Sequence, residues 1–342
     1  MNRSKIEWCD HTWNPITGCR HDCEYCYARK MTARFSGDIK FNLMQNGQYE
    51  VDGDLYILEH NFRSETGSAL AYPFGFAPTF HKYRFDYLEK LKSGQNIFVG
   101  AMADILGEWI PDEWIKMVMD ECIKYERHNY LFLTKNPERY WDLEDKGIIP
   151  SRENMWYGFT YASNQSSGWG SKYNDKHNFV SVEPLLEDLH LFNEHCFPAG
   201  EWVIIGAETG NRKGKVAPQK EWIDKILKHC DKYKIPVFMK DSMVSVVGED
   251  NMRREFPEQL QHKEISEKVK ARLEDKCCKC GKHMRKNAMI ALAARSKRGE
   301  MPKQLCHMCH KCFMDLCEEL KIRLPELEGL KDEEKKLPND GL

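Results

Sequence analysis

The sequence predicts an α/β fold in which parallel strands alternate with helices and form a partial or full β/α barrel. Between residues 96 and 239, short runs that are apolar on both faces alternate with segments of helical periodicity, which is the pattern of a parallel sheet covered by helices. Several of these runs are followed at once by polar residues. A doubly wound open sheet is the alternative, but no glycine-rich phosphate-binding run follows any strand, which disfavours a Rossmann-type site.

About seven strands are expected, one before a cysteine-rich loop and the others after residue 95. The first covers residues 12–16 and ends in a Thr-Gly turn. The later strands are expected at residues 96–102, 130–134, 155–160, 179–183, 202–206 and 236–239. Helices are expected at residues 27–35, 111–125, from 137 onward and at 218–233, the last three opened by proline. In a barrel of this kind the site lies at the carboxyl ends of the strands.

The length and composition suit a soluble globular protein with one barrel-sized domain and an appendage. The chain has 342 residues, of which 41% are hydrophobic and 30% charged, and its formal net charge of -2 indicates no partner. No apolar run is long enough to span a membrane, and the first five residues lack a signal-peptide core. We therefore expect a cytoplasmic protein without a membrane partner, whose 14 cysteines indicate metal sites and not disulfides. The metal sites are expected at the two cysteine clusters, 19–26 and 277–317, whereas the scattered Cys9, Cys122, Cys196 and Cys230 are expected to be small buried hydrophobic residues.

Three regions are expected along the chain. Residues 1–250 form the barrel, with an insertion at about 36–80 that covers the site and contains a hairpin turn at Asp52-Gly53. Residues 251–324 form a charged helix, over 252–275, and a cysteine-rich module. Residues 325–342 form a charged, disordered tail.

The first candidate site is a loop that holds three cysteines within eight residues. Cys19, Cys23 and Cys26 follow the first strand with the spacing Cys-x3-Cys-x2-Cys. Close thiolates are soft ligands suited to an iron–sulfur cluster or to zinc. A zinc site needs a fourth protein ligand, for which His21, His11 and Cys9 are the candidates.

The spacing of these cysteines, with the aromatic Tyr25 before the last of them, resembles the signature of the radical S-adenosylmethionine (SAM) superfamily. The resemblance implies a [4Fe–4S] cluster with one open iron that chelates the amino and carboxylate groups of SAM. It also implies that reduction by an external donor, flavodoxin- or ferredoxin-like, cleaves SAM and releases a 5′-deoxyadenosyl radical.

Polar residues just past successive strands are the second candidate site. Each alone is typical of a solvated loop, but in a barrel they converge on one mouth. They are Asp104, Thr134, Lys135, Thr160, Ser181, Glu183, Glu208, Lys240 and Asp241, and the candidates for a catalytic role are Lys135, Thr160 and Lys240.

Six runs, in order over residues 5–245, resemble a phage-associated, radical SAM-like family of unknown function that is distantly similar to spore photoproduct lyase. They are Ile6-Glu-Trp, Thr12-Trp-Asn-Pro-Ile-Thr-Gly-Cys, Cys26-Tyr-Ala, Leu133-Thr-Lys-Asn-Pro-Glu-Arg, Ser181-Val-Glu-Pro-Leu and Trp202-Val-Ile-Ile-Gly-Ala-Glu-Thr-Gly. This resemblance implies a barrel of the radical SAM type.

The same resemblance implies cofactor-binding roles for residues at the strand ends. Ser181 and Glu183 fit the position that contacts the SAM ribose or amino group, and the strand with Ile204, Gly206 and Glu208 fits the one beside the adenine. The usual Gly-Gly-Glu run that receives the SAM amino group is absent, and Gly100-Ala-Met-Ala-Asp stands in its place. Asp104 is therefore the candidate for that role.

The C-terminal region carries a second set of cysteines. Two Cys-x2-Cys pairs, Cys277 with Cys280 and Cys306 with Cys309, predict a structural zinc site. An auxiliary iron–sulfur cluster is the alternative, and the competing ligands are Cys278, Cys312, His283, His307 and His310. Nine Lys/Arg and one acidic residue between 276 and 304 indicate either a nucleic-acid contact or a solvated face.

The function that these features favour is a radical SAM enzyme that abstracts hydrogen from an unidentified substrate, with a nucleobase or nucleotide (modification or repair) preferred to a peptide. A base flipped out of a duplex, or single-stranded, could stack on aromatic residues of the 72–87 segment. These are Tyr72, Phe74, Phe76, Phe80 and Tyr83, for which core packing is the other role. The alternative function is a non-catalytic, zinc-containing nucleic-acid-binding protein.

Overall fold

The main unit of the chain is a seven-stranded sheet in which every pair of neighbouring strands is parallel. The computed structural model describes residues 4–92, 94–172, 174–196 and 198–261, and the backbone of residues 289–293 and 304–309. The strand order is β1-β6-β7-β8-β9-β10-β11. Their bounds are β1 His11–Trp13, β6 Asn96–Val99, β7 Asn129–Thr134, β8 Met155–Thr160, β9 His177–Val182, β10 Val203–Ile205 and β11 Val237–Met239.

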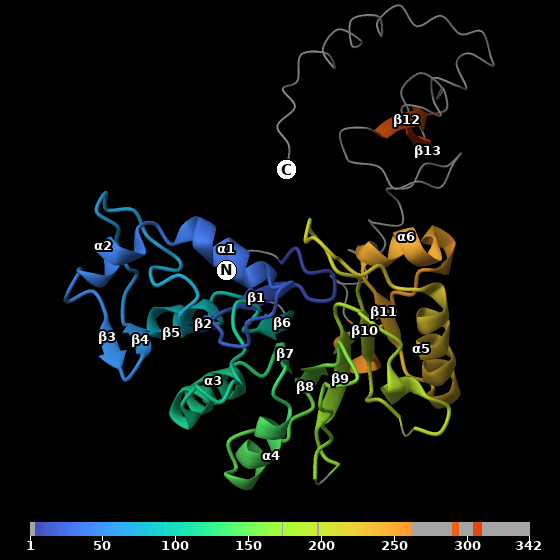
Figure 1. The fold of residues 1–342 in the computed structure, drawn as a ribbon, viewed down its shortest axis with the longest axis horizontal. Helices are drawn as coiled ribbons and strands as arrows, with labels where there is room; N and C mark the ends of the chain where they lie inside the picture. Colours follow the sequence, from blue (N-terminus) through green and yellow to red (C-terminus); the bar gives the residue numbers. More distant parts are fainter. Residues whose placement is uncertain are drawn as a thin grey trace, which may run out of the picture. The chain divides into compact units, whose positions relative to one another are not determined.

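The strands form an open U with the long helices on its outside (Figure 1). Because β1 and β11 end the strand order without pairing to each other, the described sheet is a partial barrel. The predicted α/β fold with seven strands is thereby confirmed. The connecting helices are α3 Asp112–Lys124, α4 Glu138–Asp145 and α5 Lys220–Tyr233, and α1 Tyr27–Phe35 has the bounds predicted for it.

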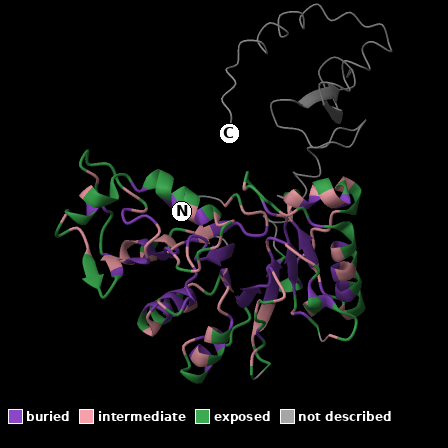
Figure 2. Cartoon of the chain, in the orientation of Figure 1, coloured by how far each residue is buried: buried purple, intermediate pink, exposed green. Residues whose placement is uncertain are grey.

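Hydrophobic packing differs between the two faces of the sheet. On the helix-covered face, α3 begins after Pro111 with two acidic residues in its first turn and buries Ile115, Val118 and Met119 against the strands. On the other face, Trp8 lies 4.7 Å from Phe98 and 6.4 Å from Trp202 between ring centroids. These strands are buried over most of their length (Figure 2).

The segment 36–80, predicted to be an insertion, supplies three strands of a separate four-stranded sheet with the order β2-β5-β4-β3. The hairpin between β3 and β4 has Gly53 at φ +61° in its turn, as predicted. The predicted strand 12–16 is wrong in one respect: it divides between the two sheets, because Pro15 cannot donate a ladder hydrogen bond. The elements are β2 Ile16–Thr17, α2 Ile39–Leu43, β3 Glu50–Asp52, β4 Leu55–Leu58 and β5 Thr79–His81.

Residues 253–255 run antiparallel along the outer edge of β11. Met239 N donates to Arg253 O at 2.8 Å, and Glu255 N donates to Val237 O at 2.9 Å. The helix predicted for 252–275 is therefore wrong over residues 252–261, where sheet pairing and Pro257 replace helical hydrogen bonds. The remaining short helices are α6 Val244–Val247 and the 3₁₀ turns Lys82–Tyr87, His190–Phe192, Asp241–Met243, Glu249–Asn251 and Glu258–Leu260.

The chain divides into two compact units, Met1–Ser266 and Glu267–Leu342. In the second unit, β12 Met289–Ala293 pairs antiparallel with β13 Gln304–Cys309. Cys306 and Cys309 lie on β13, of which only the backbone is described, and Cys277 and Cys280 lie outside the described residues. Among the helices described, none is both long and apolar enough to cross a bilayer.

Candidate active site

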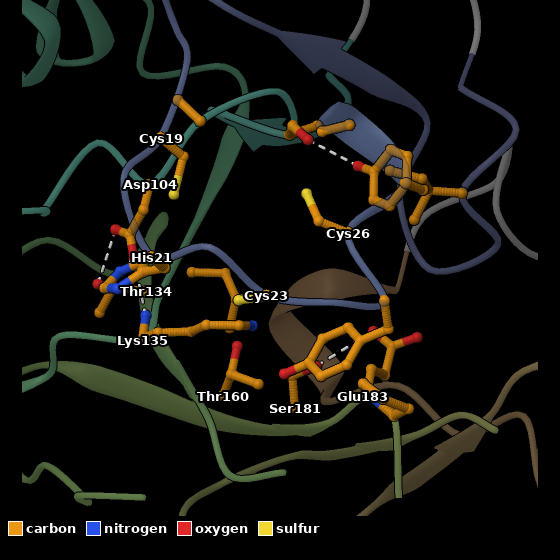
Figure 3. A pocket seen from close by; sticks show the side chains of 18 of the residues that line it. Cys19, His21, Cys23, Cys26, Asp104, Thr134, Lys135, Thr160, Ser181 and Glu183 are labelled. Carbon is orange, nitrogen blue, oxygen red and sulfur yellow. Dashed lines mark hydrogen bonds and ion pairs between the residues drawn. The ribbon is translucent and has the colours of Figure 1, made fainter. Parts of the chain in front are cut away.

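A pocket of about 230 Å³ lies at the carboxyl ends of the main-sheet strands. Figure 3 shows side chains of the cysteine loop facing residues from the strand ends across this pocket. This confirms the predicted convergence, while the individual roles stay predictions. The predicted residues that line it are Cys19, Cys23, Tyr25, Cys26, Asp104, Thr134, Lys135, Thr160, Ser181, Glu183, Glu208 and Lys240. Gly206 lies beside it, and Asp241 is turned away into an ion pair with Arg254.

Backbone geometry fixes both ends of the cysteine loop. Gly18 has φ +90°, and a Cβ there would lie 2.3 Å from Ala77 O, so only glycine lets the loop pass the small sheet so closely. At the other end, Cys26 is the N-cap of α1, and its Sγ accepts a hydrogen bond from Arg29 N at 3.4 Å. The partial positive charge of a helix N-terminus favours a negatively charged ligand there.

The thiols of the loop would have to lose their protons to bind a metal or cluster. Burial raises the pKa of Cys19 to about 12. Burial also raises the pKa of Cys23, although the Lys135 ammonium opposes that shift. Metal binding to such thiols releases protons and repays the cost of ionising them. Among the residues described, no three His, Cys, Asp or Glu side chains are grouped closely enough to hold a single ion. A tetrahedral zinc ion would need sulfurs about 4 Å apart, since each lies 2.3 Å from the metal.

The Asp104 carboxylate organises one side of the pocket. Oδ1 accepts hydrogen bonds from Thr134 Oγ1 at 2.7 Å and Leu106 N at 3.1 Å. Oδ2 accepts from His21 Nε2 at 2.7 Å and Lys135 N at 2.8 Å. Burial would raise the pKa of Asp104, yet the His21 contact and the other donors leave it below its usual value. With about four lone-pair sites on a carboxylate, this group has little capacity left for an outside amine.

His21 ties the cysteine loop to this carboxylate. Its ring packs edge-on against Trp109, with centroids 5.0 Å apart. Because Nε2 is engaged by Asp104, Nδ1 is the ring nitrogen through which His21 could act as the fourth zinc ligand that the sequence left open. The other two candidates lie outside the pocket lining: Cys9 is buried with Sγ donating to Ile6 O, and His11 lies buried on β1.

A second carboxylate, Glu183, lies across the pocket directly after β9. Its Oε2 accepts a hydrogen bond from Ser181 Oγ at 3.1 Å, and its Oε1 lies 2.7 Å from Lys240 Nζ without an aligned hydrogen bond. A Cβ at Gly206 would come within 2.9 Å of Glu183 Oε1, so glycine is what leaves room for the pair. Burial alone would lower the pKa of Lys240, but Glu183 raises it above its usual value, so the amine is a cation.

Arg212 is a residue that the sequence analysis missed. It clamps Glu208 with Nε to Oε1 at 2.6 Å and Nη2 to Oε2 at 2.7 Å. Its Nη1 also donates to Glu24 Oε2 in the cysteine loop at 3.1 Å. The hydrogen bonds from Arg212 lower the pKa of Glu208. The only sequence signal was the four-residue spacing of the Glu-Arg pair across a glycine turn.

The aromatic residues near the site divide between packing and pocket lining. Tyr25 lies beneath Lys135, whose Nζ is 5.7 Å from the ring centroid, and burial raises the pKa of Tyr25. Phe74 and Phe80 are buried in hydrophobic clusters, so their role is core packing. Phe76 lines the pocket, and Tyr27, also missed, is fixed by a 2.6 Å hydrogen bond from its hydroxyl to Ala101 O.

Several solved structures are distantly similar to this chain. They include spore photoproduct lyase with a cysteine-to-alanine change and bound dinucleoside spore photoproduct (12% identity, TM-score 0.40). A cysteine-to-serine mutant of the same enzyme has 12% identity and TM-score 0.38, and a double mutant with bound AdoMet and dinucleoside spore photoproduct has 10% and 0.37. Each alignment covers 70% of this chain and 78% of the lyase.

No curated protein matches the chain significantly. Residues 3–264 match the family described as "Protein of unknown function (DUF5131)". The predicted membership of a family of unknown function, over residues 5–245, is thereby confirmed, while its phage association stays a prediction. The chain belongs to the DUF5131 family.

Proposed function

We propose that this protein is a radical SAM enzyme that abstracts hydrogen from an organic substrate, a nucleobase or nucleotide. In this proposal Cys19, Cys23 and Cys26 hold a [4Fe–4S] cluster, which with SAM supplies the radical chemistry. The observation that carries it is that these three thiols, with the superfamily spacing, open into the same pocket as polar groups from the ends of several strands.

The protein's own groups would bind and orient SAM. Glu183 fits the ammonium of SAM, because its carboxylate lines the pocket and accepts only one hydrogen bond besides its ion pair with Lys240. Ser181 fits a ribose hydroxyl, and the backbone at Gly206 and Glu208 fits the adenine edge. Asp104, whose oxygens already accept four hydrogen bonds, is better suited to positioning His21 and the cysteine loop than to the predicted amino contact.

Of the three predicted catalytic residues, Thr160 and Lys135 remain as candidates for contact with the substrate. Lys240 is a cation paired with Glu183 and would orient that carboxylate, not act as a base. Thr160 ends β8 as a buried hydroxyl on the pocket wall, and Lys135 extends over Tyr25. A substrate and SAM that fill this pocket would exclude water from a reactive radical.

Anaerobic reconstitution tests the proposal. The full chain should turn brown and bind iron and sulfide, and dithionite should then release 5′-deoxyadenosine from SAM. Cys23→Ala should abolish cluster binding and SAM cleavage. Cys196→Ser, at a loop cysteine outside the pocket, should retain both activities. A colourless protein that carries only zinc would contradict the proposal and favour the non-catalytic, nucleic-acid-binding alternative.

The proposal extends to partners that only the sequence suggests. An external flavodoxin- or ferredoxin-like donor would supply the electron, and Cys277, Cys280, Cys306 and Cys309 would hold a structural zinc ion. The basic segment 276–304 would contact nucleic acid. Metal analysis of a variant with Cys19, Cys23 and Cys26 replaced tests whether the C-terminal cysteines hold zinc. Iron in that variant would indicate an auxiliary iron–sulfur cluster instead.

A further inference from the structure

A second, larger cleft adjoins the cysteine pocket. Its volume is about 1150 Å³, and it lies between the N-terminal segment, the small sheet's loops and the turn after β11. The two hollows have wall residues in common, which are Ile6, Tyr27, Ala101, Thr209 and Lys240. A molecule in the larger cleft would therefore reach groups that also line the cysteine pocket.

Four tyrosines line this cleft and give it aromatic surfaces. Tyr27 is 50% exposed even though its hydroxyl is bound to Ala101 O, so its ring is available for stacking. Tyr72 and Tyr83 are half-buried on the opposite segment, and Tyr87 follows them on the 3₁₀ turn. Aromatic faces held in place are suited to stacking against planar rings, such as nucleobases.

Arg84 gives the same cleft a positive charge that no carboxylate balances. The residue is 8% exposed, and its guanidinium donates only to neutral oxygens: Asn14 O at 2.8 Å, Ala71 O at 2.9 Å and the Tyr83 hydroxyl at 3.2 Å. It has no ion-pair partner among the described residues. Its five N–H groups make three bonds, which leaves donors for an anion.

The other charged groups on the cleft wall do not neutralise Arg84. Glu7 and Asp241 are both held by Arg254, and Lys240 is paired with Glu183. Lys5 adds a further cation to the wall. The charge of Arg84 also acts on buried His81, whose pKa is lowered well below 6.5 by burial and by Arg84.

We propose that this cleft binds a nucleotide, with its base against the tyrosine rings and its phosphate drawn toward Arg84. Guanidinium groups recognise phosphate through parallel N–H donors. Nucleotide binding in this cleft does not depend on the proposed radical SAM function. Only the further statement that the bound nucleotide is the substrate rests on that function. The ligand is either a free mononucleotide or a unit of a nucleic-acid strand, and both present the same base and phosphate.

Calorimetric binding to the full chain, purified without cluster, tests the cleft independently of radical chemistry. Thymidine 5′-monophosphate should bind about tenfold or more tighter than thymidine, because only the former offers a phosphate. Inorganic phosphate should compete. A ten-residue oligothymidylate that binds much more tightly than the mononucleotide identifies a strand as the source, and equal affinity identifies the free nucleotide.

Two variants and a control decide whether the named residues are responsible. Tyr72→Ala should weaken mononucleotide binding about tenfold, since base stacking contributes about 1–3 kcal/mol. Tyr125→Ala, at the end of α3 and outside the cleft, should leave binding unchanged. Arg84→Lys should reduce the preference for phosphate; if it fails to fold because its carbonyl contacts are lost, the Tyr72 result decides.

The outcomes separate this inference from the proposed function. If the reconstituted protein binds the nucleotide but cannot cleave SAM, the nucleotide-binding proposal is supported and the radical SAM function is rejected. If the protein cleaves SAM but binds no nucleotide at low salt, the proposal that this cleft binds a nucleotide is wrong. Equal affinity for thymidine and thymidine 5′-monophosphate would also contradict it.

Discussion

The two carboxylates that face each other across the cysteine pocket differ in how fully the protein satisfies them. Asp104, after β6, accepts four hydrogen bonds from its surroundings. Glu183, after β9, accepts one aligned hydrogen bond and contacts the Lys240 ammonium. A carboxylate whose lone pairs are filled holds the loops around it, whereas one with spare capacity can accept a ligand. The difference suggests a scaffolding side and a binding side of one pocket.

Asp104→Asn should have the largest effect on stability. An amide presents one acceptor oxygen, so the variant would leave two or more buried donors without partners, at about 1–3 kcal/mol each. We expect the free energy of unfolding to fall by about 2–4 kcal/mol, measured by denaturant titration. Asp250→Asn, at an exposed turn, is the matched control. A loss no larger than the control's would mean that Asp104 is not the scaffolding group.

Acid sensitivity sharpens the same assignment. Because the folded-state pKa of Asp104 lies below its usual 3.8, its contribution to stability is fully present above pH 3.8 and is lost as the pH falls through the folded value. The wild type should therefore lose more stability below pH 4 than Asp104→Asn does. Parallel stability curves for the two proteins in that range would argue against the linkage.

Glu183→Gln should affect ligand binding more than stability. The partly exposed Lys240 can turn toward water, so we expect a loss of only about 1 kcal/mol in unfolding free energy. Affinity for SAM should fall about tenfold or more, since a neutral amide replaces a charge-assisted contact. Calorimetry with the reconstituted protein measures this, with Glu221→Gln on α5 as the control. An unchanged affinity would break the proposed contrast between the two carboxylates.

Arg212→Gln removes the bidentate partner of Glu208, whose side chain is only 1% exposed. We expect the free energy of unfolding to fall by about 1–3 kcal/mol, because the variant leaves a buried carboxylate without two of its donors. The variant should allow the pKa of Glu208 to rise and should loosen the exposed loop after β10. Trypsin should then cut faster after Lys213 or Lys215. Lys220→Gln, which breaks a surface ion pair with Asp224, should not change that rate.

The sheet and the thiol loop could be predicted because their signals are local. Buried strands are visible in the sequence as apolar runs. Because a parallel sheet places the carboxyl ends of its strands together, residues such as Thr160 and Ser181 could be assigned to one mouth of the barrel. The division of the first strand at Pro15 could not be predicted, because it depends on which of two sheets offers a partner. The four hydrogen bonds that Asp104 accepts could not be predicted either, because their donors come from three separate parts of the chain.

The charge state of the second cleft was equally hidden. Arg84 is one basic residue among many in the sequence, and only the fold shows that its neighbours are carbonyl oxygens and not carboxylates. The same holds for Arg212, whose contact with Glu24 joins residues 188 positions apart.

The strand-like segment 253–255 has a practical consequence for dissecting the chain. It covers the outer edge of β11, and the residues after it are tied to the far ends of other strands, since Asn96 Nδ2 donates to Leu260 O and Asn129 Nδ2 to Gln259 O. A fragment ended at residue 250 would expose the N–H and C=O groups of that edge as a template for pairing with another molecule. It should aggregate where a fragment carried through residue 261 stays monodisperse, so the smallest manageable piece of this fold is longer than its last helix suggests.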